Sequence, residues 1–243
     1  MLLGSAALSL AGLTAAPVQA ADDATIYVVQ GLPGQTVDVA VDGKTVADGV
    51  KTAAVTKGFP VEAGSRKVTF SDDGEVLLER MMKVTAGSSW DVVLHLPADE
   101  DADPAVTIFR NDLSAVPRGK ASLTVAHTAR VGEADVRVDD KVLFADIENG
   151  ESLNLVVPVA TYEVAIVPAG KSSPVVLGPV DLTVQGGALN RVYAIGDPSK
   201  KTMNVAVHVL ETGSSGSEAP SWVDTGTGGQ AESLSRPKTD LWH

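Results

Sequence analysis

Short runs of alternating apolar and polar residues recur along most of the chain. Residues 37–42 read Val-Asp-Val-Ala-Val-Asp, and residues 135–139 read Asp-Val-Arg-Val-Asp. Such alternation places β-branched side chains on one face of a strand and polar ones on the other. Turn-forming residues such as Asp42-Gly43 and Asp72-Asp73-Gly74 separate these runs. No stretch has a helical period, so the pattern predicts an all-β protein.

The runs also repeat in order. Thr25–Val29 is matched by Ser122–Ala126, and Val37–Lys44 by Ala134–Lys141, in each case 97 residues further on. The last third realigns at an offset of 99, which sets Val106–Ile108 against Val205–Val207 and Trp90 against Leu189. We therefore predict a tandem repeat of one module.

The predicted fold is two tandem immunoglobulin-like β-sandwich modules of about seven strands each. Module 1 spans residues 21–113, a linker spans 114–120, and module 2 spans 121–211. We expect so short a linker to limit the relative motion of the modules without abolishing it. Because aromatic residues make up only 4% of the chain, the cores should be aliphatic.

The two ends differ from the modules. Residues 1–20 begin with an uncharged apolar run and end on Pro17-Val18-Gln19-Ala20, which fits a signal peptide cleaved before Ala21. A buried helix and a membrane anchor are the alternatives, but about 20 apolar residues are needed to cross a bilayer. The basic residues usual before such a run are missing. Residues 212–243 are rich in Gly, Ser and Thr, which predicts a disordered tail.

Charge and cysteine content narrow the function classes. The formal net charge of −12 argues against a nucleic-acid partner, because phosphate binding needs a clustered basic face. The absence of cysteine removes disulfides, thiolate metal sites and cysteine nucleophiles.

The repeated blocks resemble the bacterial family called domain of unknown function 4397 (DUF4397). The resemblance rests on Val28–Gly34 and Val37–Gly43 in the first module and on Asp135–Asp139 and Pro158–Val164 in the second. It covers roughly residues 24–210 and implies an exported or surface protein, of a family common in high-GC Gram-positive bacteria, with no catalytic residues attached. Two departures are His127, whose counterpart is Gln30, and Asp140, which replaces the turn residue Gly43.

Repeated carboxylates are the first candidate for chemistry. Asp38 and Asp42, and likewise Asp135 and Asp139, supply oxygen atoms of the kind that Ca²⁺ binds. Residues i and i+4 of a strand lie about 13 Å apart, too far for one ion, so we expect an outward-facing Asp and a turn Asp. The acidic run Asp99–Asp103 lacks the spacing of a calcium loop, and its counterpart Asp197–Lys201 is basic, which favours a solvated loop.

Histidines and tryptophans give weaker signals. His95, His127, His208 and His243 lack metal-ligand spacing. His127, near the end of its strand, is the one candidate for a functional group. Trp90 favours a core role, while Trp222 and Trp242 are candidate recognition elements in the tail. Gly226–Gly229 lies outside any strand–helix context and is discounted as a phosphate loop.

Together these features predict no catalytic, cofactor-binding or metal-binding residues. We expect a non-enzymatic, secreted or cell-envelope protein that binds an envelope or extracellular protein or polymer, with no transmembrane segment in the mature chain. A structural spacer without a specific ligand is the alternative, and an extracellular hydrolase is a third, weaker hypothesis.

Overall fold

A computed structural model describes residues 23–212 and 214–215, which form strands, turns and loops. The strands of the first half are β1 (Ala24–Gln30), β2 (Thr36–Val41), β3 (Lys44–Lys51), β4 (Phe59–Val61), β5 (Gly64–Asp72), β6 (Glu75–Val84), β7 (Ser89–His95) and β8 (Ala105–Arg110). Those of the second half are β10 (Lys120–Ala129), β11 (Ala134–Val138), β12 (Lys141–Ile147), β13 (Ser152–Pro158), β14 (Thr161–Pro168), β15 (Leu177–Thr183), β16 (Ala188–Gly196) and β17 (Asn204–Glu211). None of these residues forms a helix long and apolar enough to cross a membrane.

Each half is a sandwich of two four-stranded sheets, as the alternation predicts. In module 1 the sheets are β4-β1-β7-β8 and β3-β2-β5-β6; in module 2 they are β13-β10-β16-β17 and β12-β11-β14-β15. The prediction of two tandem sandwiches is confirmed, with eight strands in each rather than about seven. The strand order, with β1 parallel to β7 and β10 parallel to β16, differs from the ABED/CFG order of immunoglobulin constant domains.

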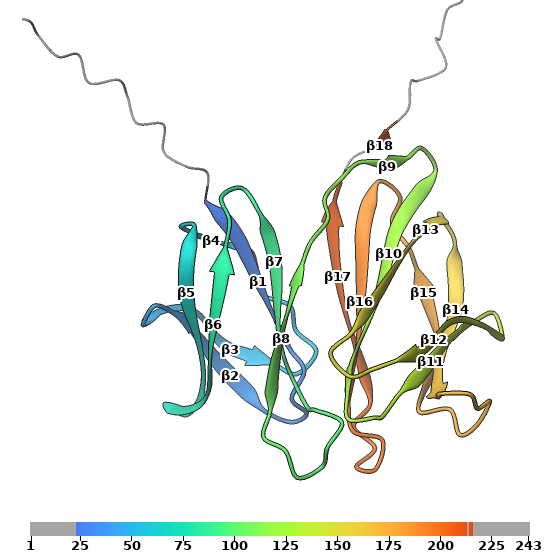
Figure 1. Ribbon diagram of the computed structural model, residues 1–243, viewed down its shortest axis with the longest axis horizontal. Helices are drawn as coiled ribbons and strands as arrows, with labels where there is room; N and C mark the ends of the chain where they lie inside the picture. Colours follow the sequence, from blue (N-terminus) through green and yellow to red (C-terminus); the bar gives the residue numbers. More distant parts are fainter. Residues whose placement is uncertain (1–22, 213, 216–243) are drawn as a thin grey trace, which may run out of the picture.

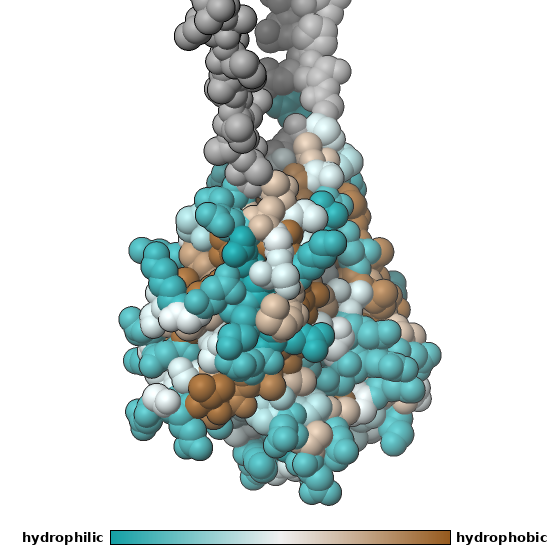
Figure 2. All heavy atoms as spheres, turned by 60° about the vertical axis from the view of Figure 1, so that its left-hand side comes forward, coloured by the Kyte–Doolittle hydropathy of each residue, from teal (hydrophilic) through white to brown (hydrophobic). Residues whose placement is uncertain are grey.

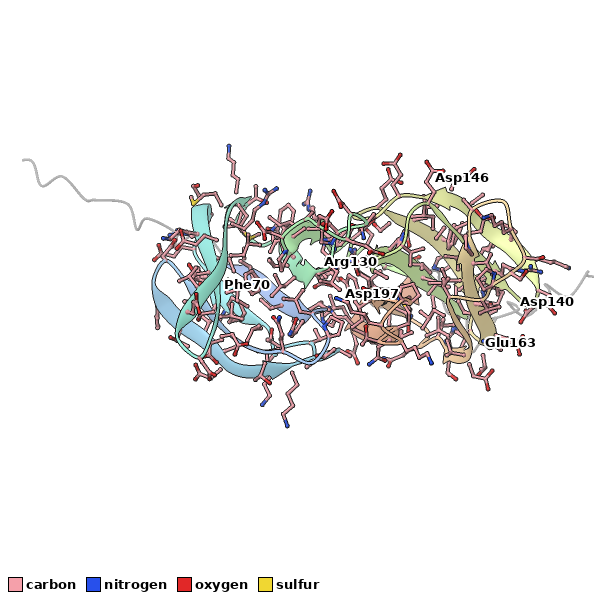
Figure 3. All side chains as sticks on the ribbon, turned by 90° about the horizontal axis from the view of Figure 1, so that it is seen from below. Phe70, Arg130, Asp140, Asp146, Glu163 and Asp197 are labelled. Atoms are coloured by element: carbon pink, nitrogen blue, oxygen red, sulfur yellow. The ribbon has the colours of Figure 1, made fainter. Side chains whose placement is uncertain are left out.

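Each sandwich has its own aliphatic core. Val37 and Val39 of β2 point inward and are fully buried, and Phe70 of β5 packs beside them in module 1 (Figure 3). Val136 of β11 and Ile166 of β14 lie at the corresponding points of the module 2 core. The two-residue period of the sequence thus places the buried faces correctly.

A third core joins the modules. The sheets β4-β1-β7-β8 and β13-β10-β16-β17 face each other, so the molecule has four layers of sheet in a row (Figure 1). Val29, Val93 and Phe109 of module 1 pack against Tyr193 and Ile195 of module 2 between these inner sheets. All nine residues of β16 are buried, because one face meets the module 2 core and the other meets module 1.

The segment that connects the two modules pairs with the chain just after the last strand of module 2. A short strand, β9 (Val116–Pro117), lies within the predicted linker and pairs with β18 (Ser214–Ser215), while β10 begins at Lys120, the last predicted linker residue. The predicted signal peptide of residues 1–20 and nearly all of the predicted tail lie outside the described residues.

The pairing registers give the correspondence between the halves. Thr25 of β1 lies opposite Ser89 of β7, whereas Ser122 of β10 lies opposite Leu189 of β16. Trp90 therefore corresponds to Asn190, so the alignment of Trp90 with Leu189 is wrong by one residue. In the corrected register, Asp91 corresponds to Arg191.

Candidate functional site

The first aspartate of each repeated pair fixes a hairpin. Asp38 Oδ1 accepts a 2.7 Å hydrogen bond from the Gly49 N–H, and Asp135 Oδ1 accepts one of 3.0 Å from the Asp146 N–H. Gly49 and Asp146 have φ angles of +62° and +54°, and each lies where the hairpin shifts register. The Asp therefore holds a β-bulge in place. Asp135 is buried, contrary to the expected outward position.

The second aspartate of each pair fixes a turn, as expected. Asp42 Oδ1 accepts a hydrogen bond from the Lys67 N–H, and Asp139 Oδ1 accepts one from the Glu163 N–H. The backbone hydrogen bond from Lys67 and the Arg66 guanidinium lower the pKa of Asp42. Across residues 23–212 and 214–215, no group of His, Asp and Glu side chains could hold a metal ion.

His127 holds a loop by its backbone. Its Nε2 lies 2.9 Å from the Gly132 carbonyl oxygen and 3.2 Å from that of Val131, so Nε2 carries the proton and donates. Gln30, at the corresponding position, likewise binds the backbone of Leu32 and Gln35. The departure from Gln to His thus preserves a structural role.

Of the other sequence candidates, Trp90 packs against the module 1 core, and its Nε1 donates to Ser88 Oγ. Asp99–Asp103 forms an exposed loop on module 1. His95 is buried, with Nδ1 3.1 Å from the Leu96 carbonyl oxygen and Nε2 2.8 Å from Thr107 Oγ1. His243, Trp222, Trp242 and Gly226–Gly229 lie outside the described residues.

A cluster of buried charged and polar side chains lies between the two sheets that face each other across the module interface. Asp91 of β7 is fully buried and accepts hydrogen bonds from Asn111 Nδ2 at 2.8 Å, from His208 Nδ1 at 3.0 Å and from the Tyr193 hydroxyl. Arg191 Nε lies 3.9 Å from Asp91 Oδ2. We call these five residues the interface cluster. Its members come from both modules and lie far apart in the sequence, so the spacing of these residues along the chain does not predict the cluster.

The contacts of the interface cluster are reciprocal. Asp91 and Arg191 occupy corresponding positions, as do Phe109 and His208. Asp91 binds His208 across the interface, and Arg191 lies over the Phe109 ring at 5.3 Å. The two modules thus meet as the subunits of a two-fold dimer do, with opposite charges at the equivalent central positions.

Titration behaviour follows from this burial. Burial acts to raise the pKa of Asp91, but the hydrogen bond and charge of His208, with Asn111 and Tyr193, outweigh it and lower that pKa. Burial, then the Asp91 charge, raise the pKa of Tyr193 well above its usual value. Burial lowers the pKa of both His95 and His127. The hydrogen bonds described here hold these side chains in the fold.

An apolar pocket opens at one side of module 2. It has a volume of about 370 Å³ and lies between β15 and β17, with Val180, Leu182, Ala194, Val205 and Val207 among its lining residues. Asp181 and Asn204 are its only lining residues with polar side chains. The volume lies at the lower end of the roughly 300–1,000 Å³ typical of ligand pockets. We call it the module 2 pocket.

Smaller side chains account for the module 2 pocket. Leu94 of β7 is fully buried in the module 1 core, and the corresponding residue of β16 is Ala194. Phe70 likewise corresponds to Ile166. In addition, β6 lies against β8 in module 1, whereas β15 and β17 make no comparable contact. Module 2 therefore leaves open a space that module 1 fills.

The fold and these two features define a two-module, all-β sandwich protein with an apolar pocket in its second module. The family model described as domain of unknown function (DUF4397) matches residues 24–137, from the start of β1 to β11. This match confirms the expected resemblance over residues 24–137. A search of curated proteins found no match.

Replacing Asp135 tests the structural role of the repeated aspartates. Asp135→Ala removes the acceptor for two backbone N–H groups, of Asp146 and Gly170, from a buried site, and should cost about 1–3 kcal/mol in urea unfolding. Asp38→Ala, which removes one bond at a less buried site, should cost less. Millimolar Ca²⁺ should leave the melting temperatures of the wild type and of both variants unchanged. A rise in the melting temperature of the wild type alone would contradict the structural role of these aspartates.

Removing Asp91 tests the interface cluster. Asp91→Ala leaves Arg191 buried without its carboxylate and should lower the free energy of unfolding by about 3–5 kcal/mol. Glu79→Ala, which breaks the exposed pair with Lys67, is the control and should cost far less, because solvent screens an exposed pair. Equal costs in urea unfolding would refute the central place of Asp91.

Buried histidines predict acid sensitivity. Their pKa values are lower in the folded chain than the roughly 6.5 of an unfolded one, so the unfolded state binds more protons as the pH falls below that value. Stability should therefore drop on going from pH 7.5 to pH 5, by at most about 1.4 kcal/mol per pH unit for each histidine. His127→Gln, which places the module 1 residue there, should reduce this slope and match the wild type above pH 8. An unchanged slope would be the contrary result.

Proposed function

We propose that the protein is a non-enzymatic, secreted or cell-envelope binding module that holds an apolar part of an envelope or extracellular partner in the module 2 pocket. The observation that carries this proposal is the pocket itself: apolar walls, an open mouth, and a filled counterpart in module 1. An exposed or open apolar surface of this kind is typical of interaction sites.

Several features support the non-enzymatic part of the proposal. The buried histidines and carboxylates described above are engaged in loops, hairpins and the module interface. The pocket lining contains no His, Ser, Thr, Lys or Arg side chain. Catalysis needs convergent polar groups around a reacting atom, which such a lining does not offer.

Address and origin are part of the same proposal. The predicted signal peptide of residues 1–20 and the net charge of −12 support an exported protein without a nucleic-acid partner. The common strand order of the halves supports a tandem repeat in which module 1 became a brace and module 2 kept an open side.

A structural spacer is the second candidate function, and the interface favours it. A buried core and an ion pair between the modules suit a stiff block that holds other parts of the cell surface apart. A spacer would need no open pocket, which is why we rank it second.

Filling the pocket separates the two functions. Ala194→Leu introduces the side chain that module 1 has at the corresponding position and should abolish saturable binding of a neutral apolar dye such as Nile red. Leu94→Ile, a volume-conserving change in the closed module 1 core, is the matched control and should retain it. The same pair of variants should differ in capture of envelope molecules. Equal dye binding and equal capture by both variants would remove the pocket from the function and leave the spacer.

A further inference from the structure

Strand β17 is an edge strand that borders the module 2 pocket. Among residues 23–212 and 214–215 it pairs with β16 on one side and with no strand on the other. The side chains of Val207 and Val209 are 44% and 39% exposed, and Val205 and Val207 line the pocket. An apolar cavity and an open sheet edge therefore lie side by side.

Within the part of the chain that the structure describes, the edge of β17 has none of the usual protection. Proteins usually blunt edge strands with Pro, Lys, register shifts or a covering segment. Such features occur at the other sheet edges. The edge strands β4, β13 and β15 contain Pro, and β3 and β12 have register shifts. Of the remaining two edge strands, β6 contains Lys83, and β8 lies against β6. In contrast, β17 is eight residues long, without Pro, Lys, Arg or a register shift.

Backbone groups of β17 face the open side. The Val205 N–H donates a 2.8 Å hydrogen bond to Asn204 Oδ1 rather than to β16. Because successive residues of an antiparallel strand alternate in direction, the N–H and C=O groups of Val207 and Val209 also face away from β16. A strand added there would find donors and acceptors directly beside the pocket.

Charge argues for the kind of partner. Glu211 ends β17 and Asp181 lies at the pocket, in a chain of net charge −12. Two such chains repel each other, which disfavours a second copy as the occupant. Asp181 and Glu211 together with the negative net charge instead favour a segment that carries basic residues over an acidic one. The side of the molecule around module 1's outer sheet, by contrast, is covered mostly by hydrophilic residues (Figure 2).

We propose that module 2 binds an extended polypeptide segment by adding it as a fifth strand beside β17, with alternate apolar side chains in the module 2 pocket and basic residues at its ends. Main-chain hydrogen bonds supply affinity in this mode, and the pocket supplies selectivity. This inference rests on the proposed function, because it assigns an occupant to the same pocket.

The test uses the full chain and the capped peptide Lys-Thr-Val-Thr-Val-Thr-Val-Lys, with binding measured by calorimetry. We expect one saturable site. Methylation of the peptide's alternate backbone nitrogens should weaken binding at least tenfold, which corresponds to the loss of about one or two hydrogen bonds. A peptide of the same composition with its valines contiguous should also bind more weakly.

Two protein variants locate the site. Val207→Lys places a charge on the open edge and should weaken peptide binding at least tenfold. Val76→Lys, at a residue of β6 that is 56% exposed, is the matched control and should bind as the wild type does. Because both valines are largely exposed, both variants should fold, and their urea unfolding curves verify this.

The remaining outcomes are distinct. If the methylated peptide or decylamine binds as well as the parent peptide and Ala194→Leu abolishes that binding, the strand-addition inference is overturned and the proposed function stands. If the chain forms a dimer that Val207→Lys dissociates, a second copy occupies the edge and the inference is likewise overturned. If neither the peptides nor an apolar dye binds, both proposals fail.

Discussion

The structure depends on the burial of Asp91 between two sheets that face each other. A fully buried carboxylate is costly unless it is paired and hydrogen-bonded, and here every partner except Asn111 comes from the other module. The apolar residues around it form a core that neither module has alone. The two sandwiches therefore act as one block, and the segment that connects them contributes little to their relative placement. The loop contacts below the cluster agree: Asn149 Nδ2 and Arg130 Nε of module 2 bind the carbonyl oxygens of Leu96 and Pro97, and Figure 3 shows Arg130 at this junction.

The two halves keep the same strand order and use it differently. Features that recur in both, such as the aspartates that fix the bulges and turns, maintain the scaffold. Features that differ, such as Asp91 against Arg191 and Leu94 against Ala194, create the interface and the pocket. In the proposed function, module 1 is the closed brace and module 2 the open binding half.

Much of the fold could be predicted from the sequence, because strand alternation and turn residues are local signals. The alternation of Val37, Val39 and Val41 with mostly polar residues predicts the buried face of β2, and the pair Asp42-Gly43 predicts the turn that follows it. The role of Asp135 was missed, since the two N–H groups that it binds belong to Asp146 and Gly170, far along the chain. The interface was missed as well, because Ser122, Thr124 and Thr128 give one face of β10 the polar character of a solvent-facing strand, although that face is buried. The pocket could not be predicted, because it arises from differences in side-chain size between equivalent positions of the two modules. Those positions, such as Leu94 and Ala194, are recognised as equivalent only from the strand pairing.

The buried interface fixes the two modules relative to each other. The chain has no cysteine, so spin labels at Lys51→Cys and Lys171→Cys, both exposed and one in each module, report a single inter-module distance by electron–electron double resonance. The account predicts one narrow distance distribution for the double variant. A broad or multimodal distribution would show that the modules move independently and would contradict it.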